Sequence, residues 1–208
     1  RVPQLKDCKN HLKLDKVDKK TGKAEGEDTM IFLTEGQSAG GTLGGARDAM
    51  NQAVFFLRGK CLNTCGLNKD VLYKNEEFFN LIKTLDIEDT LEHLRYGKII
   101  FATDADVDGL HIRMLLTTFF MRFYRQLILD GRVFILETPL FRVRNKTVTT
   151  YCYSEDERDR MMKQIRGAEV TRFKGLGEIS AKEFGQFIGE DMRLIPVNIE
   201  SLAETRKA

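Results

Sequence analysis

Short apolar runs alternate with longer stretches of mixed polarity along most of the chain. The apolar runs have the length of buried strands, and they predict strands at 30–34, 53–57, 98–103, 132–137 and 140–144. We expect helices between them, at 46–52, twice within 75–95, at 110–129, and on both sides of a strand within 155–188. Strands separated by helices predict an α/β fold, with a Rossmann-like parallel sheet flanked by helices.

Composition divides the chain into three parts. Residues 1–28 are polar and rich in lysine, with glycines that interrupt any periodicity, so we expect an exposed connector there rather than core. Residues 29–145 carry the α/β pattern, and residues 146–208 are expected to form an α+β extension. Because the first residue is Arg1 rather than Met, we expect the sequence to be a piece of a longer protein.

Charge and cysteine usage exclude several classes of protein. With 33 Lys and Arg against 31 Asp and Glu, the net charge of +2 excludes a polybasic binder but not a locally basic site. No apolar run approaches the roughly 18–20 residues of a membrane span, so no membrane partner is expected. Four dispersed cysteines favour reduced thiols in a cytoplasm. A zinc site of Cys8, His11, Cys61 and Cys65 is disfavoured, because the pairs lack the usual tight spacing.

Acidic residues directly follow two of the predicted strands. Glu35 ends the first apolar run, and Asp104, Asp106 and Asp108 follow the run at 98–103. Both acidic segments open into glycine and then a helix, and ligands collect where parallel strands end beside helix N-termini. Oxygen ligands suit a hard cation such as Mg²⁺, which also offsets the repulsion among clustered carboxylates. The sequence therefore predicts a metal site.

Three chemistries come into question for the D-x-D-x-D-G run. A calcium-binding EF-hand loop fails, since its twelfth position is Leu115 instead of a bidentate Glu and a strand precedes it. A phosphatase or phosphotransferase would use Asp104 as nucleophile and Asp106 as acid, but it leaves Glu35 without a role. Metal-assisted phosphodiester chemistry on nucleic acid uses every acidic residue, and we favour it.

Two basic loops accompany the acidic residues. Arg58, Lys60 and Asn63 follow a predicted strand, around a glycine that allows close backbone approach, and Lys174 lies in a second loop of this kind. Such loops beside a metal fit a DNA phosphate backbone, although single cations near turns are mostly solvated. His111, one turn into the next helix, could reach a phosphate or simply be an exposed or capping residue.

Four motifs occur in a fixed order along the chain. They are EGQSAGG at residues 35–41, FLRGKCLN at 56–63, TDADVDGLHI at 103–112 and FKGLGE at 173–178. They are similar to the EGDSAGG, PLRGKxLN, TDADVDGxHI and YKGLGE motifs of one family. The chain thus resembles the Toprim domain of bacterial type IIA DNA topoisomerase B subunits, found in topoisomerase IV and gyrase.

The resemblance implies roles for individual residues. The catalytic residues that it implies are Glu35, Asp104 and Asp106. The same three residues would hold one or two Mg²⁺ ions, for which Mn²⁺ or Ca²⁺ can substitute, with Asp108 as a weaker ligand. The contacts to double-stranded DNA would be Lys60 and Asn63, with weaker assignments for Arg58, His111 and Lys174.

The same resemblance implies partners and an activity. The nucleophilic tyrosine would belong to a partner A subunit, in an A2B2 heterotetramer of the cytoplasm that is associated with the nucleoid. The full enzyme would relax and decatenate DNA by ATP-dependent strand passage. The ATP-binding half of the family's B subunit is missing from this sequence and no nucleotide-binding loop is present, so we expect no activity without an ATPase domain and the A subunit.

Two departures from the family pattern leave alternatives open. Gln37 stands where Asp is usual, which puts metal affinity in question, and Phe56 stands where Pro is usual. The short connection between Arg144 and Phe173 favours topoisomerase IV over gyrase. The rival hypotheses are a stand-alone phosphotransferase and a structural paralogue without chemistry.

Overall fold

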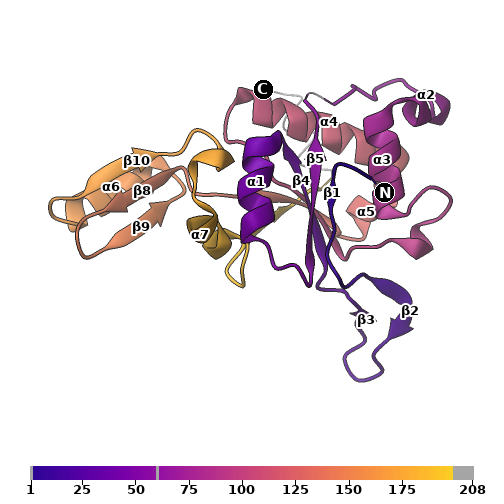
Figure 1. The fold of residues 1–208 in the computed structure, drawn as a ribbon, viewed down its shortest axis with the longest axis horizontal. Helices are drawn as coiled ribbons and strands as arrows, with labels where there is room; N and C mark the ends of the chain where they lie inside the picture. Colours follow the sequence, from indigo (N-terminus) through magenta and orange to yellow (C-terminus); the bar gives the residue numbers. More distant parts are fainter. Residues whose placement is uncertain (1, 60, 199–208) are drawn as a thin grey trace.

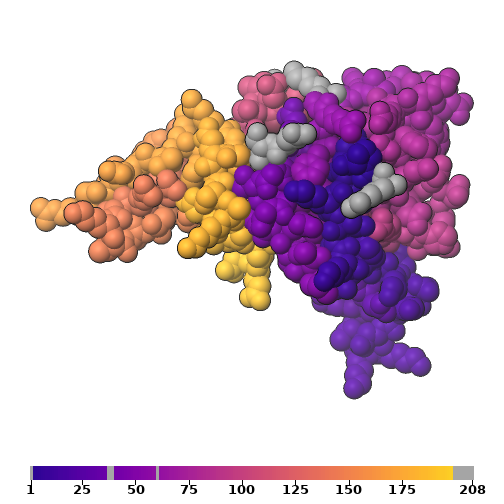
Figure 2. Space-filling view, viewed as in Figure 1, coloured from indigo at the N-terminus to yellow at the C-terminus, as the bar shows by residue number. Residues whose placement is uncertain are grey.

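The computed structural model describes residues 2–59 and 61–198, with the backbone alone at 37–39. An α/β body carries two projections, a hairpin near the N-terminus and a small C-terminal sheet (Figures 1 and 2). The strands are β1 (Leu5–Lys6), β2 (Lys13–Val17), β3 (Ala24–Glu25), β4 (Met30–Glu35), β5 (Gln52–Leu57), β6 (Lys98–Phe101), β7 (Val133–Glu137), β8 (Phe141–Arg144), β9 (Thr149–Cys152), β10 (Glu169–Arg172) and β11 (Arg193–Pro196). The helices are α1 (Gln37–Ala46), α2 (Lys69–Lys74), α3 (Glu76–Leu85), α4 (Val107–Phe123), α5 (Arg125–Leu129), α6 (Glu155–Gln164) and α7 (Ala181–Phe184), with 3₁₀ turns η1 (Leu91–His93), η2 (Leu176–Glu178) and η3 (Gly185–Phe187).

The main sheet has the strand order β1-β5-β4-β6-β7-β11. Its four inner strands are parallel, and β1 and β11 pair antiparallel at the two edges. From β4 the chain passes through α1 to β5 on one side, and later returns to β6 and β7 on the other side. The strand order therefore reverses between β4 and β6, which is where ligands bind in open α/β sheets. The predicted fold class is confirmed.

Helices cover both faces of the sheet. Leu33 belongs to the same core cluster as Phe78 of α3 and Phe119 of α4, whose rings stack with centroids 4.5 Å apart. Phe32, its neighbour in β4, faces the opposite cluster together with Leu43 of α1. Since successive residues of a strand point to opposite faces, burial on both faces requires an unbroken apolar strand. This explains why the strands could be located from short apolar runs.

Helix α1 begins earlier than the sequence suggested. A helix was expected at 46–52 after a glycine loop, but the glycine run itself is helical over Gln37–Ala46 and the next residues form a turn. A Cβ atom on Gly40 would lie 1.9 Å from the ring of Phe56. Glycine is thus used for close packing of α1 on β5, and tertiary contact overrides the weak helical preference of glycine.

The other helix predictions differ from the structure in detail. The second of the two helices expected within 75–95 is only the short turn η1, and α2 was not predicted. The helix expected at 110–129 is divided at Tyr124, whose backbone (φ −138°, ψ 42°) is not helical. It also starts earlier, at Val107, because the Asp106 side chain accepts a hydrogen bond from the Gly109 N–H at 2.7 Å and caps it.

The N-terminal segment corrects the expectation of an exposed connector over 1–28. Leu5–Lys6 pair with β5, and the side chains of Cys8 and Leu12 are buried in the main core. Only the β2–β3 hairpin, at the bottom of Figure 1, is largely exposed. Lysine-rich composition concealed a segment that supplies one edge strand of the sheet, because the few apolar residues that anchor it are widely spaced.

A three-stranded antiparallel sheet, β10-β8-β9, forms the C-terminal projection with α6 (Figure 1). Its own small cluster centres on Phe141, Val143 and Cys152. Arg142 of β8 pairs with Glu183 of α7 at 2.5 Å and so ties the projection to the body. None of the described helices is long and apolar enough to cross a membrane.

Candidate metal and nucleic-acid site

The two acidic segments lie at the carboxyl ends of the parallel strands of the main sheet. Leu33 of β4 pairs with Phe101 of β6, so Glu35 at the end of β4 and Asp104 just beyond β6 lie at the same end of these two parallel strands. The strand order reverses between β4 and β6, and helices α1 and α4 both begin at the carboxyl ends of these strands. The fold thus places the ends of two acidic segments that are far apart in the sequence on neighbouring strands.

Asp104 is half-buried and contacts the C-terminal part of the chain. Its Oδ1 accepts a hydrogen bond from the backbone N–H of Leu176 at 2.7 Å, across 72 positions of sequence. Burial raises the pKa of Asp104, and the carboxylates of Asp106 and Glu178 raise that pKa further, while the Leu176 N–H opposes the shift. A raised carboxyl pKa caused by burial and negative neighbours marks a position where a cation would be stabilised.

Asp106 is held at the start of α4 by its capping hydrogen bond to Gly109. Arg113, further along α4, donates from Nε to Thr103 Oγ1 at 2.7 Å. Burial lowers the pKa of the Arg113 guanidinium, and the charge of Asp106 opposes that shift, so the two side chains interact electrostatically. This arginine was not predicted from the sequence, although it lies only two positions after His111.

The oxygen ligands at the carboxyl ends of β4 and β6 fit a hard divalent cation. Glu35 is partly buried, while Asp106 and Asp108 are exposed, and all four predicted ligands offer oxygen atoms. Oxygen donors are the ligands that Mg²⁺ prefers, and burial together with the nearby carboxylates of Asp106 and Glu178 raises the pKa of Asp104. The chemistry of these four residues therefore fits Mg²⁺. They follow two different strands and do not form one compact group of ligand atoms.

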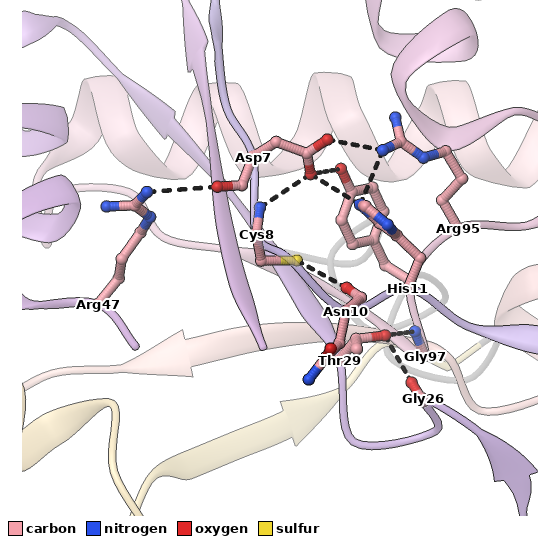
Figure 3. A network of polar contacts seen from close by, with 10 residues as sticks. Asp7, Cys8, Asn10, His11, Gly26, Thr29, Arg47, Arg95 and Gly97 are labelled. Carbon is pink, nitrogen blue, oxygen red and sulfur yellow. Dashed lines mark hydrogen bonds and ion pairs between the residues drawn. The ribbon is translucent and has the colours of Figure 1, made fainter. Parts of the chain in front are cut away.

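A compact group of potential ligands lies elsewhere, beside β1 (Figure 3). Within residues 2–59 and 61–198, the side chains of Asp7, Cys8 and His11 have ligand atoms within 4.8 Å of one another. Arg95 Nη2 lies 2.6 Å from Asp7 Oδ2 and 2.7 Å from His11 Nε2, and the Tyr96 hydroxyl donates to Asp7 Oδ1 at 2.6 Å. A guanidinium against two of the three ligands opposes a further cation, so we regard this group as a structural network.

The charge of Asp7 is stabilised by this network. Burial alone raises the pKa of Asp7, but hydrogen bonds from Tyr96, His11 and Arg95 outweigh it and lower the pKa to about 2. The network was not foreseen, because Asp7, Cys8 and His11 lie in the predicted connector, whereas Arg95 and Tyr96 come from a distant part of the sequence.

The four cysteines are free, as expected for reduced thiols. Cys61 and Cys65 are not part of the compact group that Cys8 and His11 form with Asp7. Burial raises the pKa of the Cys61 thiol to about 12, so this thiol is not a reactive group.

The loop after β5 carries three of the predicted DNA contacts. Arg58 is exposed, its Nη1 lies 3.9 Å from Glu76 Oε1, and its backbone N–H donates to Glu77. Asn63 is exposed, and its side chain accepts a hydrogen bond from the next-but-one backbone N–H and so shapes the turn. Lys60 lies outside the described residues. The loop therefore presents polar side chains at the same end of the parallel strands as Glu35.

A cavity of about 420 Å³ lies between this loop and the start of α1. It is lined by Pro3, Gln4, Lys6, Gly36, Gly41, Phe56, Leu57, Arg58 and Gly59. The departure at position 56 has a structural consequence, since the Phe56 N–H donates to the Gln4 carbonyl at 2.9 Å. A proline at that position could not form this bond.

The last two predicted contacts lie on α4 and in the loop 173–178. His111 and Lys174 are both exposed, and the Lys174 N–H donates to Glu178 Oε2 at 2.8 Å. The sequence pattern indicated a basic loop here and did not reveal that Glu178 is close enough to influence Asp104. The sequence feature that could have indicated this carboxylate is the acidic last residue of the FKGLGE motif, Glu178.

Comparison with known proteins agrees with this geometry. The sequence matches the Toprim domain family over residues 30–138. It is 50% identical over 209 residues to the B subunit of DNA topoisomerase 4 from Borreliella burgdorferi, covering 100% of this chain and 34% of that protein. It is 41% identical over 186 residues to the B subunit of DNA gyrase from Thermotoga maritima, covering 86% and 29% respectively. The higher identity to the topoisomerase IV protein agrees with the preference drawn from the short connection after β8.

A solved structure shows the same architecture. The DNA-binding, cleavage and re-ligation domain of Plasmodium falciparum topoisomerase II superposes with a TM-score of 0.72 at 25% identity, covering 90% of this chain and 26% of that one. The chain spans about a third of the length of the curated relatives described above. Since the family match extends over more than half of the residues and includes both acidic segments, the chain belongs to the Toprim domain family.

Proposed function

We propose that this chain is the Mg²⁺-binding DNA cleavage and religation module of a type IIA DNA topoisomerase. The observation that carries the proposal is the position of Glu35 and the Asp104 segment at the carboxyl ends of the neighbouring parallel strands β4 and β6, between which the strand order reverses. The named relatives, which are topoisomerase IV and gyrase B subunits, support the same reaction class.

In this proposal Glu35, Asp104 and Asp106 hold one or two Mg²⁺ ions, and Asp108 supports them. Bound metal supplies stabilisation of negative charge on the scissile phosphate and on the leaving oxygen. The protein's own contribution is orientation: the Gly109 N–H holds the Asp106 carboxylate and the Leu176 N–H holds that of Asp104.

The DNA backbone is proposed to lie across the loop after β5. Arg58, Lys60 and Asn63 then face phosphates, with His111 and Lys174 at the margins, and such contacts position the duplex without reading its sequence. The cavity beside this loop, to which Lys6 and Arg58 contribute, supports the assignment. The net charge of +2 is compatible with this site, because acidic ligands and basic loops of opposite sign offset one another in the sum over the chain.

The remaining parts of the reaction belong to other domains in this proposal. The nucleophilic tyrosine comes from a partner A subunit in an A2B2 assembly of the cytoplasm, and an ATPase domain drives strand passage, relaxation and decatenation. A stand-alone phosphotransferase is less well supported, because it would use Asp104 and Asp106 and leave Glu35 without a role.

Reconstitution tests the proposal. We expect the full-length subunit with its A subunit to cleave DNA in the presence of Mg²⁺, and Asp104→Ala to reduce cleavage by at least ~100-fold. Asp15→Ala, on the exposed strand β2, is the matched control and should leave cleavage unchanged. Undiminished cleavage by Asp104→Ala would contradict the proposal. Hydrolysis of an aryl phosphate by the full-length protein alone, lost in Asp104→Ala, would instead support the phosphotransferase.

A further inference from the structure

The loop 174–178 covers the carboxylate of Asp104. Gly175 has an extended backbone (φ −146°, ψ 161°) that any residue can adopt, so backbone conformation does not require glycine here. Space does: a Cβ atom on Gly175 would lie 3.0 Å from Asp104 Oδ2 and 3.2 Å from Oδ1. The next residue, Leu176, donates its N–H to Oδ1 at 2.7 Å. One glycine and one amide thus surround the carboxylate from a distant part of the chain.

The loop itself is firmly held. Before it, the Phe173 N–H donates to the Leu140 carbonyl at 2.8 Å, and within it the Lys174 N–H donates to Glu178. The Leu176 side chain is only 2% exposed and packs in the same core cluster as residues of β6. A void of only about 10 Å³ lies between the loop, Ala105 and the residues Thr138 and Pro139 that follow β7. Because the loop is anchored by hydrogen bonds and by the buried Leu176 side chain, its Leu176 N–H has a defined place against the carboxylate of Asp104.

We propose that residues 174–178 are a positioning element of the metal site: the Leu176 N–H orients Asp104, and Gly175 keeps the space in which its carboxylate lies. This inference rests on the proposed function, in which Asp104 is a metal ligand. The loop follows β10 directly, so it also connects the C-terminal sheet to the metal site. Groups that orient metal ligands typically change metal affinity 10- to 100-fold when altered.

Gly175→Ala tests the spatial part of the proposal. In the full-length subunit we expect Mn²⁺ affinity, measured by electron paramagnetic resonance without DNA, to fall about tenfold, because the carboxylate must shift by a few tenths of an ångström. Gly185→Ala is the matched control, since its Cβ would meet nothing closer than a backbone oxygen at 4.0 Å. With the A subunit present, higher Mg²⁺ should restore DNA cleavage by Gly175→Ala but not by Asp104→Ala.

Hydrogen exchange tests the hydrogen bond independently of whether Gly175→Ala folds. In otherwise wild-type protein, Asp104→Ala removes the acceptor, so the Leu176 amide should exchange about tenfold faster, while Asp15→Ala leaves it unchanged. Unchanged Mn²⁺ affinity in Gly175→Ala, or an unchanged Leu176 exchange rate in Asp104→Ala, would overturn the positioning role. If Asp104→Ala binds Mn²⁺ as tightly as wild type does, the proposed function itself fails.

Discussion

Two partly buried aspartates in different parts of the molecule have opposite electrostatic surroundings. Asp7 accepts hydrogen bonds from Tyr96 and Arg95 and lies beside His11, and these contacts outweigh burial and lower its pKa to about 2 (Figure 3). Asp104 accepts a backbone hydrogen bond from Leu176, and burial together with acidic neighbours raises its pKa. The first carboxylate is neutralised by the protein, whereas the second is surrounded by further negative charge.

The contrast separates a structural carboxylate from a functional one. A paired carboxylate stabilises the fold and has little capacity left for a ligand, whereas clustered carboxylates reduce stability until a cation binds. Compactness alone would select the group that Arg95 already neutralises, since the ligand atoms of Asp7, Cys8 and His11 lie close together. The distribution of positive charge around each carboxylate is the better guide.

The largest difference is expected in stability. Asp7→Asn should lower the free energy of unfolding by about 2–3 kcal/mol, because Arg95 loses its charged partner in a half-buried site. Asp104→Asn keeps an oxygen acceptor for Leu176 and removes repulsion, so a change within about 0.5 kcal/mol is expected. Urea denaturation of both variants measures this, and equal destabilisation would remove the distinction.

The stabilisation by Mg²⁺ should depend on Asp104 and not on Asp7. At a concentration about 100 times the dissociation constant, Mg²⁺ should raise the free energy of unfolding by about 2.7 kcal/mol in wild-type protein and in Asp7→Asn. Asp104→Asn should show little of this increase. Thermal unfolding with and without Mg²⁺ provides the measurement, and a Mg²⁺ response lost in Asp7→Asn instead would place the metal beside β1.

The loss of folding stability in acid should depend on Asp7. Its folded-state pKa of about 2 lies below the ordinary value of 3.8, so its contribution is present above pH 4 and is lost as the pH falls towards 2. We expect a loss of about 1–2 kcal/mol, reduced by solvent screening because 33% of the side chain is exposed. Asp104 has the opposite sign: its raised pKa favours the folded state at low pH. Asp7→Asn should therefore show a flatter acid limb in denaturation experiments at pH 2–5.

The smallest effect is expected at the margin of the metal site. Thr103→Val removes the acceptor of the Arg113 Nε–H and should cost about 1 kcal/mol of stability. Thr118→Val is the matched control on the same helix as Arg113, because its hydroxyl donates to a carbonyl of the preceding turn in an exposed position. A cost for Thr103→Val no larger than that for Thr118→Val would show that Arg113 is not anchored there.

The inner strands of the main sheet were predictable from sequence, whereas both of its edge strands and several helices were not. Strand β4 is buried on both faces, so its apolar run is continuous and stands out. Helix α1 is rich in glycine, and its position depends on contact with Phe56 in a strand that follows it. The same holds for β1, which is only two residues long and is recognisable only through its partner β5.

By itself the sequence determined the motifs, the inner strands of the main sheet, and the acidic residues that follow two of those strands. Those features depend on local periodicity and residue chemistry, which can be seen in a single chain. Tertiary structure alone decided which carboxylate would be paired by Arg95 and which would face Glu178 and Leu176. The physical reason is that the pKa of a carboxyl group depends on its burial and on charges a few ångströms away, and those neighbours come from segments distant in sequence.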